Sequence, residues 1–275
     1  MISEAEEGLI LSRAYIPEHI PSLMSSISGG EPFLGSGYLS YSGEDWLIFV
    51  GYPLEGDVEL QEALDAVLEK ASPRTVFLIA PHIPSSVPCL EKKGDWYYTL
   101  DLRDYRIKKS LRYRVRRALR ALRVETGEIS DEHSRLVEEF LEEEKPEAHV
   151  RELFRRMPEY ASRHDKCVVL NALDHEDRLA AFFLVDVSPR DFAAYLIGCY
   201  SRSNPVQGAS DLLFSEMIAL ARKEEKKRLN LGLGVSPGIK KFKEKWGGSP
   251  TIRYESCSWD ADYEKAMELL KLWKY

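Results

Sequence analysis

A glycine-rich stretch near the end of the chain, LNLGLGVSPGIKKFKEKWGG at 229–248, has the residue types from which phosphate-binding loops are built. The dinucleotide fingerprint needs glycine at its first, third and sixth positions, but the sixth position counted from Gly232 is Pro237. A P-loop needs Gly-Lys-Ser/Thr after a four-residue gap, and no lysine follows Gly238 directly. The pattern instead predicts a short apolar strand, a tight turn and a helix that Ser236 caps and Pro237 begins.

A second stretch, RIKKSLRYRVRRALRALRVE at 106–125, is strongly basic. Its apolar residues recur at helical spacing, which predicts an amphipathic helix over 105–123 with arginines and lysines on the remaining surface. Such a surface is either a solvated face that balances acidic stretches or a binding surface for phosphates, for which arginine is suited by its two-pronged hydrogen bonding. Contacts to tRNA or to another phosphate-bearing anion are predicted for Arg112, Arg116, Arg117 and Arg120.

Alternating and helical hydrophobic patterns predict the elements that would position these stretches. The first hundred residues indicate two strands, a helix and a strand, then a loop at 82–95 and a further strand at 96–102. The rest indicates two helices, an antiparallel meander of three strands, a helix, a strand, the helix of the glycine-rich stretch, a strand at 251–259 and a terminal helix at 262–275.

Bulk composition excludes several classes of protein. The formal net charge of -7 and the pI near 5.6 argue against a general coat for nucleic acids, although a local basic patch is allowed. The four cysteines are scattered without a Cys-x-x-Cys pair, so neither a zinc site nor a disulfide framework is expected, and a reducing cytoplasm is predicted. No metal is expected. The longest apolar run, at 179–185, is too short to span a bilayer.

Over about 124–259, and more loosely over the first hundred residues, the order of elements resembles the GNAT superfamily of acyltransferases. The run YYTLDLRDY, the basic helix and the stretch from GASDLLF to KWGG are more narrowly similar to Fem-like proteins, which carry two GNAT-type units in one chain. The most specific element is Gly238, then Phe242-Lys243, then Gly247-Gly248.

This resemblance implies an α/β (α+β) protein in which a mixed, mostly antiparallel sheet is flanked by helices. Its expected organisation is a smaller first GNAT-like unit at 1–104, a basic linking helix at 105–123 and a complete second unit at 124–275. The resemblance also implies that acyl transfer is the activity.

In GNAT enzymes the pyrophosphate of coenzyme A lies on the N-terminus of the helix after the fourth strand. Free amides and the helix dipole attract phosphate there. The equivalent stretch is SRSNPVQGASDLL, so the resemblance assigns the donor to Gln207, Gly208, Ala209 and Ser210. Pro205 and Ser210 depart from the family pattern, and Fem-like proteins that use aminoacyl-tRNA also depart from it.

The resemblance further implies that the fourth and fifth strands of the second unit splay apart, so that backbone groups near Ile197, Gly198 and Cys199 hold the donor arm. The reaction needs donors aimed at a developing oxyanion and a base for the attacking amine. Tyr195 and Tyr200 are candidate proton donors to the leaving group.

Glu216 is the candidate base, with Asp186 as a further choice. Lys243 corresponds to a lysine that stabilises a donor phosphate in Fem-like proteins. The glycines before it are expected to let the fifth strand approach its neighbours or a ligand closely and then turn sharply into the helix that carries Lys243.

Three functions follow from these expectations. The first is an N-acyltransferase that moves an acyl group from acetyl-CoA or another acyl-CoA to a small-molecule or peptide amine. The second is a Fem-like aminoacyltransferase that uses aminoacyl-tRNA with a peptidoglycan-precursor or lipid acceptor. The third is a ligand-binding protein that keeps the GNAT fold without catalysis.

Overall fold

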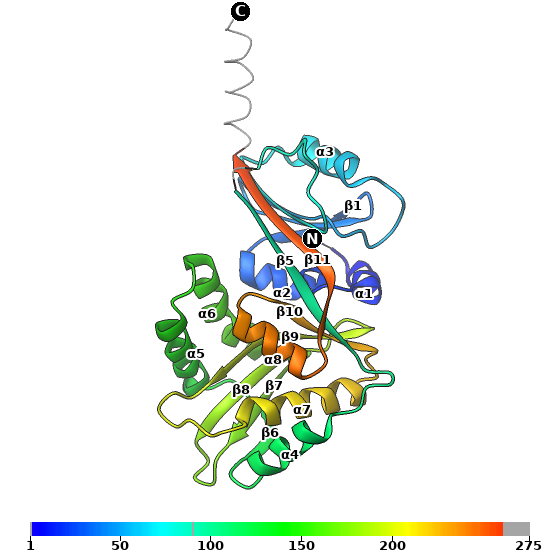
Figure 1. The fold of residues 1–275 in the computed structure, drawn as a ribbon. Coiled ribbons are helices and arrows are strands. Elements are labelled where there is room, and N and C mark those ends of the chain that lie inside the picture. Colours follow the sequence, from blue (N-terminus) through cyan, green and yellow to red (C-terminus); the bar gives the residue numbers. More distant parts are fainter. Residues whose placement is uncertain (1, 90, 261–275) are drawn as a thin grey trace, which may run out of the picture.

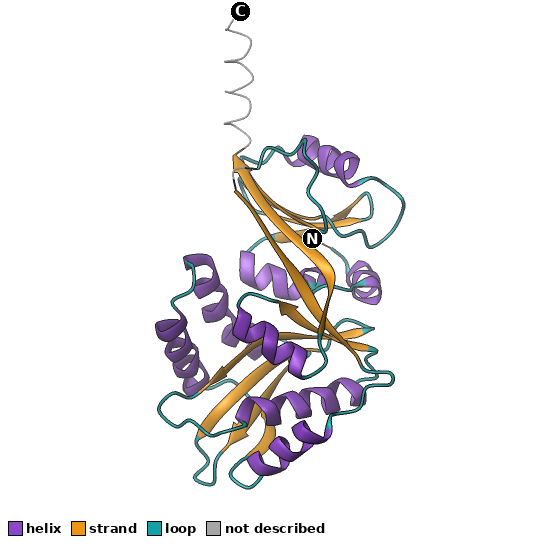
Figure 2. Cartoon of the chain, in the orientation of Figure 1, coloured by secondary structure: helices purple, strands orange, loops and turns teal. Residues whose placement is uncertain are grey.

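A computed structural model describes residues 2–89 and 91–260. Its strands form one eleven-stranded sheet in the order β1-β2-β3-β4-β11-β5-β10-β9-β8-β7-β6, and helices flank the sheet (Figures 1 and 2). The fold is therefore the mixed, mostly antiparallel α/β architecture that the sequence predicted. The terminal helix predicted at 262–275 lies outside the described residues.

The first part of the chain contains short helices and four strands at one end of the sheet. Its elements are α1 (Glu4–Arg13), a 3-10 turn η1 (Pro17–His19), α2 (Pro21–Ser28), β1 (Glu31–Gly35), β2 (Tyr38–Ser42), β3 (Trp46–Val50), α3 (Leu60–Ala71) and β4 (Thr75–Ala80). The predicted strand, strand, helix and strand correspond to β2, β3, α3 and β4, whereas β1 and the helices before it were not predicted.

The second part has its helices and strands in the predicted order, except that β6 was not predicted. Its elements are α4 (Lys109–Ala118), β6 (Arg123–Gly127), α5 (Asp131–Glu144), α6 (Ala148–Arg163), β7 (Cys167–Leu173), β8 (Leu179–Asp186), β9 (Phe192–Tyr200), α7 (Ala209–Lys223), β10 (Arg228–Leu233) and α8 (Pro237–Lys245). Strands β7, β8 and β9 pair antiparallel, which confirms the predicted meander.

Two long strands join the parts. Strand β5 (Glu91–Asp101) pairs with β10, and β11 (Ser249–Asp260) lies between β4 and β5. The last described strand thus completes the sheet of the first part, and Figure 1 shows β5 and β11 running side by side from one part to the other.

Alternating side chains divide the second part into two cores. Phe183 and Val185 face α7, whose Leu213 and Met217 are fully buried. Side chains from the other face of β8 pack against α2, α5 and α6. Each strand of the meander is consequently covered on both sides, so its sequence reads as an almost continuous apolar run.

Several boundaries differ from the sequence prediction. The basic helix α4 covers ten residues and ends at Ala118, and the following residues turn into β6, whose Val124 pairs with Ala172 of β7. Strand β5 begins at Glu91, because Lys92 and Lys93 pair with β11 although their side chains are polar. Long-range pairing overrides local composition at both places.

The prediction that the cysteines form no disulfide is wrong. Cys89 and Cys257 are bonded, with Cα atoms 5.5 Å apart, and join the loop after β4 to β11. The sequence separation of 168 residues hid this pair, since only the insertion of β11 beside β4 brings the two positions together. Within the described residues, no helix is long and apolar enough to cross a membrane.

Candidate functional site

The most distinctive feature of the second part is the parting of β9 and β10. The two strands pair in parallel only where Arg228 to Asn230 face Phe192 to Ala194. Strand β9 continues to Tyr200 and β10 to Leu233 without pairing to each other, although β10 stays beside β5. Backbone groups along 195–200 therefore have one open edge, as the expected splay requires.

A β-bulge lies where the strands part. Tyr195 pairs with Val185 and Ile197 with Leu184, so Leu196 is an extra residue on β9. A bulge leaves a residue outside the ladder and increases the local twist, which helps β9 to turn away from β10. The bulge at Leu196 is thus a structural cause of the open edge, and the sequence pattern did not predict it.

Gly198 makes room for Tyr195 across this bulge. A Cβ atom at Gly198 would lie 2.3 Å from the Tyr195 hydroxyl and 2.5 Å from Cδ1 of Phe183, so no larger residue fits. The Tyr195 ring packs edge-on against Phe183, and burial raises the pKa of its hydroxyl. Tyr195 therefore keeps its proton at neutral pH.

Asn230 fixes the end of β10. Its side chain is fully buried, its Oδ1 accepts a 2.9 Å hydrogen bond from the Gly232 amide, and its Nδ2 donates to the carbonyl oxygen of Tyr15 at 3.4 Å. Gly232 has a φ of 72°, which favours glycine. Asn230 was not predicted as a site residue, and its only sequence signal was a polar residue inside an apolar strand.

Lys243 lies beside the parted strands. Its helix α8 begins as predicted, with Ser236 as N-cap and Pro237 in the first turn. Only 5% of Lys243 is exposed, and its Nζ donates to the carbonyl oxygen of Leu233 at 2.5 Å. Burial lowers the pKa of the ammonium group to about 8, and the nearby carboxylate of Asp95 opposes that shift.

The N-terminus of α7 opens into a basic groove of about 780 Å³. Gln207, Gly208 and Asp211 form one wall, and the other wall comes from α4. The α4 residues are Lys109, Ser110, Tyr113, Arg114 and Arg117. Three cationic side chains therefore stand opposite the positive end of a helix, which is a favourable environment for phosphate.

Asp211 gives this groove an unusual chemistry. Its carboxylate lies in the first turn of α7, is 6% exposed, and accepts hydrogen bonds from Lys245 Nζ and, at 2.9 Å, from Trp246 Nε1. A carboxylate that is paired with Lys245 therefore lies in the helix turn beside which a pyrophosphate would bind, and it makes this end of the helix less favourable for an anion. The α4 side of the groove is the more favourable place for phosphates.

The remaining candidate residues lie at varied distances from this centre. Ile197 and Cys199 are each 2% exposed and point into the core, so only their backbone faces the open edge, and burial raises the pKa of the Cys199 thiol to about 12. Tyr200 is exposed at the end of β9, where Arg202 lies over its ring. Glu216 is half-buried near the middle of α7.

Three further groups complete the predicted set. Asp186 is fully buried and accepts hydrogen bonds from the Tyr160 hydroxyl and the Ser188 amide, with a pKa that burial raises. Ala209 is buried and Ser210 follows it in the first turn of α7. Arg117 lines the groove, while Arg112, Arg116 and Arg120 are exposed on the rest of the basic surface.

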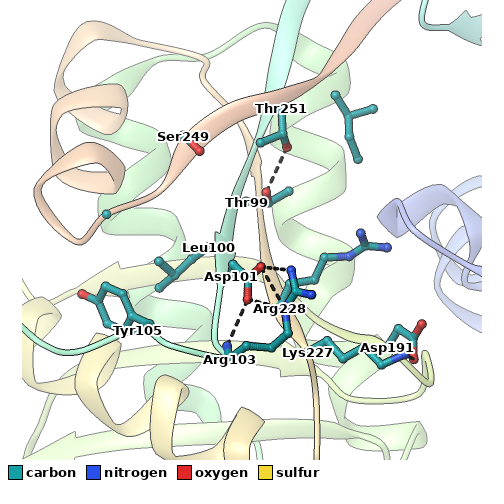
Figure 3. Close-up of a pocket in the computed structure, with 12 residues that line it drawn as sticks. Thr99, Leu100, Asp101, Arg103, Tyr105, Asp191, Lys227, Arg228, Ser249 and Thr251 are labelled. Atoms are coloured by element: carbon teal, nitrogen blue, oxygen red, sulfur yellow. Dashed lines mark hydrogen bonds and ion pairs between the residues drawn. The ribbon is translucent and has the colours of Figure 1, made fainter.

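A second hollow, of about 580 Å³, lies at the start of β10 (Figure 3). Thr99 and Thr251 hydrogen-bond across it at 2.9 Å, and Arg103 pairs with Asp101. Its lining includes Arg228, the first residue of β10, whereas the open edge adjoins the last. None of its residues was predicted, and most of its charges are already paired.

Comparison with known families gives one match. Residues 106–244 match the family model of the acetyltransferase (GNAT) domain. No curated protein gives a significant match. The matched range runs from the basic helix through Lys243 on α8, so it contains the open edge and the basic groove.

Solved structures share the whole fold. The C-terminal domain of a protein named as a lysylphosphatidylglycerol synthetase from Agrobacterium fabrum superposes with a TM-score of 0.64 at 17% identity, covering 97% of this chain and 96% of that one. FemX gives 0.60 at 10% identity, with 93% and 96% covered. A tandem GNAT protein from the clavulanic acid biosynthesis pathway gives 0.52 at 14% identity, with 93% and 94% covered.

Proposed function

This chain belongs to the GNAT acetyltransferase family and has the fold of Fem-like proteins built from two GNAT-type units, and from that premise we propose that it takes an aminoacyl group from aminoacyl-tRNA. The observation that carries the proposal is the pairing of a broadly basic α4 with a carboxylate, Asp211, at the N-terminus of α7. The acceptor is a nucleophile on a peptidoglycan precursor or a lipid, for which one structural neighbour, named for a lysyl-bearing lipid, is the precedent.

The extent of the basic surface supports a nucleic acid donor. Coenzyme A has a compact set of phosphates, which the groove residues Lys109, Arg114 and Arg117 would be enough to bind. Arg112, Arg116 and Arg120 lie outside the groove and are exposed. A longer polyanion that continues past the groove would use them, because each phosphate neutralised releases counterions.

The proposed reaction uses the open edge of β9. The nucleophile attacks the ester carbonyl, a new bond to the carbonyl carbon forms, and the bond to the ribose oxygen of the tRNA breaks. Amides of the open edge stabilise the oxyanion, and Lys243 stabilises the terminal phosphate of the donor. Tyr195 supplies a proton to the departing oxygen, and Glu216 accepts the proton of the nucleophile.

An acyl-CoA donor is the second candidate, and the parted strands support it. An extended arm fits between separated strands, and the amides at Gly208 could still bind one phosphate. This alternative needs the groove but not the exposed arginines, which makes the two donors separable by experiment.

The test is a pair of double variants titrated with charged tRNA and with acetyl-CoA. Arg114→Gln/Arg117→Gln alters the groove, and Arg112→Gln/Arg116→Gln alters only the exposed surface of the same helix. We expect charged tRNA to bind the wild type with an affinity that falls at least tenfold between 50 and 200 mM salt, and both double variants to weaken it. The proposal would be rejected if the wild type bound acetyl-CoA but no charged tRNA, and if acetyl-CoA binding were lost in the groove variant and kept in the surface variant.

A cytoplasmic location is part of this proposal, since charged tRNA is found there. The Cys89–Cys257 disulfide argues against it, because structural disulfides are rare in reducing compartments.

A further inference from the structure

The side chain of Glu18, in η1, has a buried oxygen atom without a partner. Glu18 Oε2 is inaccessible to solvent, and within the described residues neither this oxygen nor the buried Tyr97 hydroxyl has a hydrogen-bond partner within ordinary limits of distance and angle, although the Glu18 and Tyr97 side chains are close enough to interact. Within the described residues no cationic side chain forms an ion pair with Glu18. The molecule therefore places in its interior a carboxyl group that has no ion-pair partner among the described residues, and such a group favours its protonated form unless a cation binds it.

Aromatic rings surround this carboxylate. The tyrosine cluster, as we name it, comprises Tyr15, Tyr41, Tyr52, Tyr97 and Tyr254. Its ring centroids lie 6.2 Å apart for Tyr15 and Tyr52, 6.2 Å for Tyr52 and Tyr97, and 5.5 Å for Tyr97 and Tyr254. Burial raises the pKa of Glu18, and the Tyr97 hydroxyl opposes that shift.

The tyrosine cluster adjoins the end of β10. Tyr97 pairs with Leu233, the residue whose carbonyl oxygen accepts the hydrogen bond from Lys243. The carbonyl oxygen of Tyr15 accepts from Asn230, which closes the cluster against the point where the strands part. Glu18 thus lies on the other face of β5 from Lys243, since Tyr97 and Tyr98 alternate along that strand.

We propose that Glu18 and the tyrosine cluster form a subsite for a primary ammonium group. A carboxylate with a free oxygen supplies the charge, and tyrosine rings attract a cation through their faces. The ammonium comes either from the transferred aminoacyl group or from the acceptor. This inference rests on the proposed aminoacyl transfer and names the chemical group that the transfer would select.

The test uses calorimetric titration with two pairs of probes. Aminoacyl-adenosine with a free or an acetylated amine reports on the donor, and n-butylammonium compared with n-butanol reports on the acceptor. We expect the charged member of at least one pair to bind the wild type ten or more times more tightly than its neutral partner. The pair that shows the preference identifies the source of the ammonium.

Glu18→Gln keeps the shape of the side chain and removes its charge. We expect this variant to lose the preference while its melting temperature stays equal or rises, since the side chain keeps its shape and can no longer ionise in the interior. Glu44→Gln, at an exposed position of the same part of the chain, should keep the preference. Equal binding of charged and neutral probes by the wild type, or an unchanged preference in Glu18→Gln, would overturn the inference.

A separate measurement tests whether aminoacyl-tRNA is the donor. Charged tRNA binding depends on α4, so the absence of tRNA binding would count against the donor while the ammonium titration is still interpretable. Arg114→Gln/Arg117→Gln should weaken tRNA binding and leave the n-butylammonium result unchanged, because these arginines lie in the groove by α7 and not in the tyrosine cluster.

Discussion

The ammonium group of Lys243 donates to the carbonyl oxygen of Leu233 from a nearly water-free position at the end of β10. The bond holds a cation beside the place where β9 and β10 part, and no carboxylate of the described residues forms an ion pair with it. An anion that entered the parted strands would meet this cation without first having to displace a salt bridge, which makes Lys243 the most testable group of the site.

We expect Lys243→Met to change the pH dependence of stability. Between pH 8 and 10.5 the unfolded chain holds a proton on Lys243 that the folded protein has lost, so wild-type stability rises with pH there relative to the variant. Below pH 8 both states are protonated, and the penalty of burying the charge, on the order of 3 kcal/mol, is fully present. Urea unfolding of both proteins at pH 7, 8, 9 and 10 measures the difference, and parallel curves would contradict a desolvated ammonium.

Asp211→Asn should strengthen binding of phosphate donors. The change removes a negative charge from the first turn of α7 and keeps an oxygen that can accept from Trp246 Nε1. We expect roughly three- to tenfold tighter binding of acetyl-CoA or tRNA, since one negative charge is lost, together with a clear loss of stability, because Lys245 loses a carboxylate partner that is almost fully buried. If the variant instead bound both acetyl-CoA and tRNA more weakly than the wild type, Asp211 would be shown to organise the groove and not to repel its ligand.

Gly198→Ala should destabilise the protein by about 1–3 kcal/mol. The new methyl group would collide with the Tyr195 hydroxyl and with Phe183. The double variant Gly198→Ala/Tyr195→Phe removes one of the two collisions, so it should recover part of the loss. Thermal unfolding of the single and double variants measures this coupling, and additive effects would show that the two residues do not press on each other.

Reduction of the Cys89–Cys257 bond should lower the unfolding free energy by about 2–4 kcal/mol, because the bond closes a long loop in the unfolded chain. The melting temperature should fall by roughly 5–10 °C in dithiothreitol. Cys89→Ser/Cys257→Ser should match the reduced wild type and respond no further to reductant. A wild type that melts identically with and without reductant would mean that the bond does not form in solution.

The sequence predicted most of the second part because its elements carry local signals. The meander is recognisable as apolar runs separated by short turns, and Ser236 and Pro237 mark the start of α8. Strand β6 gave no such signal, since its side chains are mostly exposed and only pairing with β7 makes it a strand.

Only those parts of the candidate site that lie within one continuous sequence motif could be predicted from the sequence. Lys243 and the turn at Gly208 follow from a family pattern, but the bulge at Leu196 is a property of two paired strands, and no single segment records it. Glu18 lies far from these in sequence and comes near them because Tyr97 of β5 and the hydrogen bond between Tyr15 and Asn230 connect the tyrosine cluster to β10. Residues that are brought together by the order of strands in the sheet cannot be recognised as neighbours from local sequence patterns.

Strand β11 has a consequence for how the molecule is made. Strands β4 and β5 are neighbours in sequence, yet the position between them is filled by residues 249–260. While the ribosome is still synthesising the second part, the first part has a missing strand, and β4 and β5 each expose an unsatisfied backbone edge. The nascent chain is therefore vulnerable to aggregation until residues 249–260 have been synthesised, and the first part should complete its sheet only after the second part has been made.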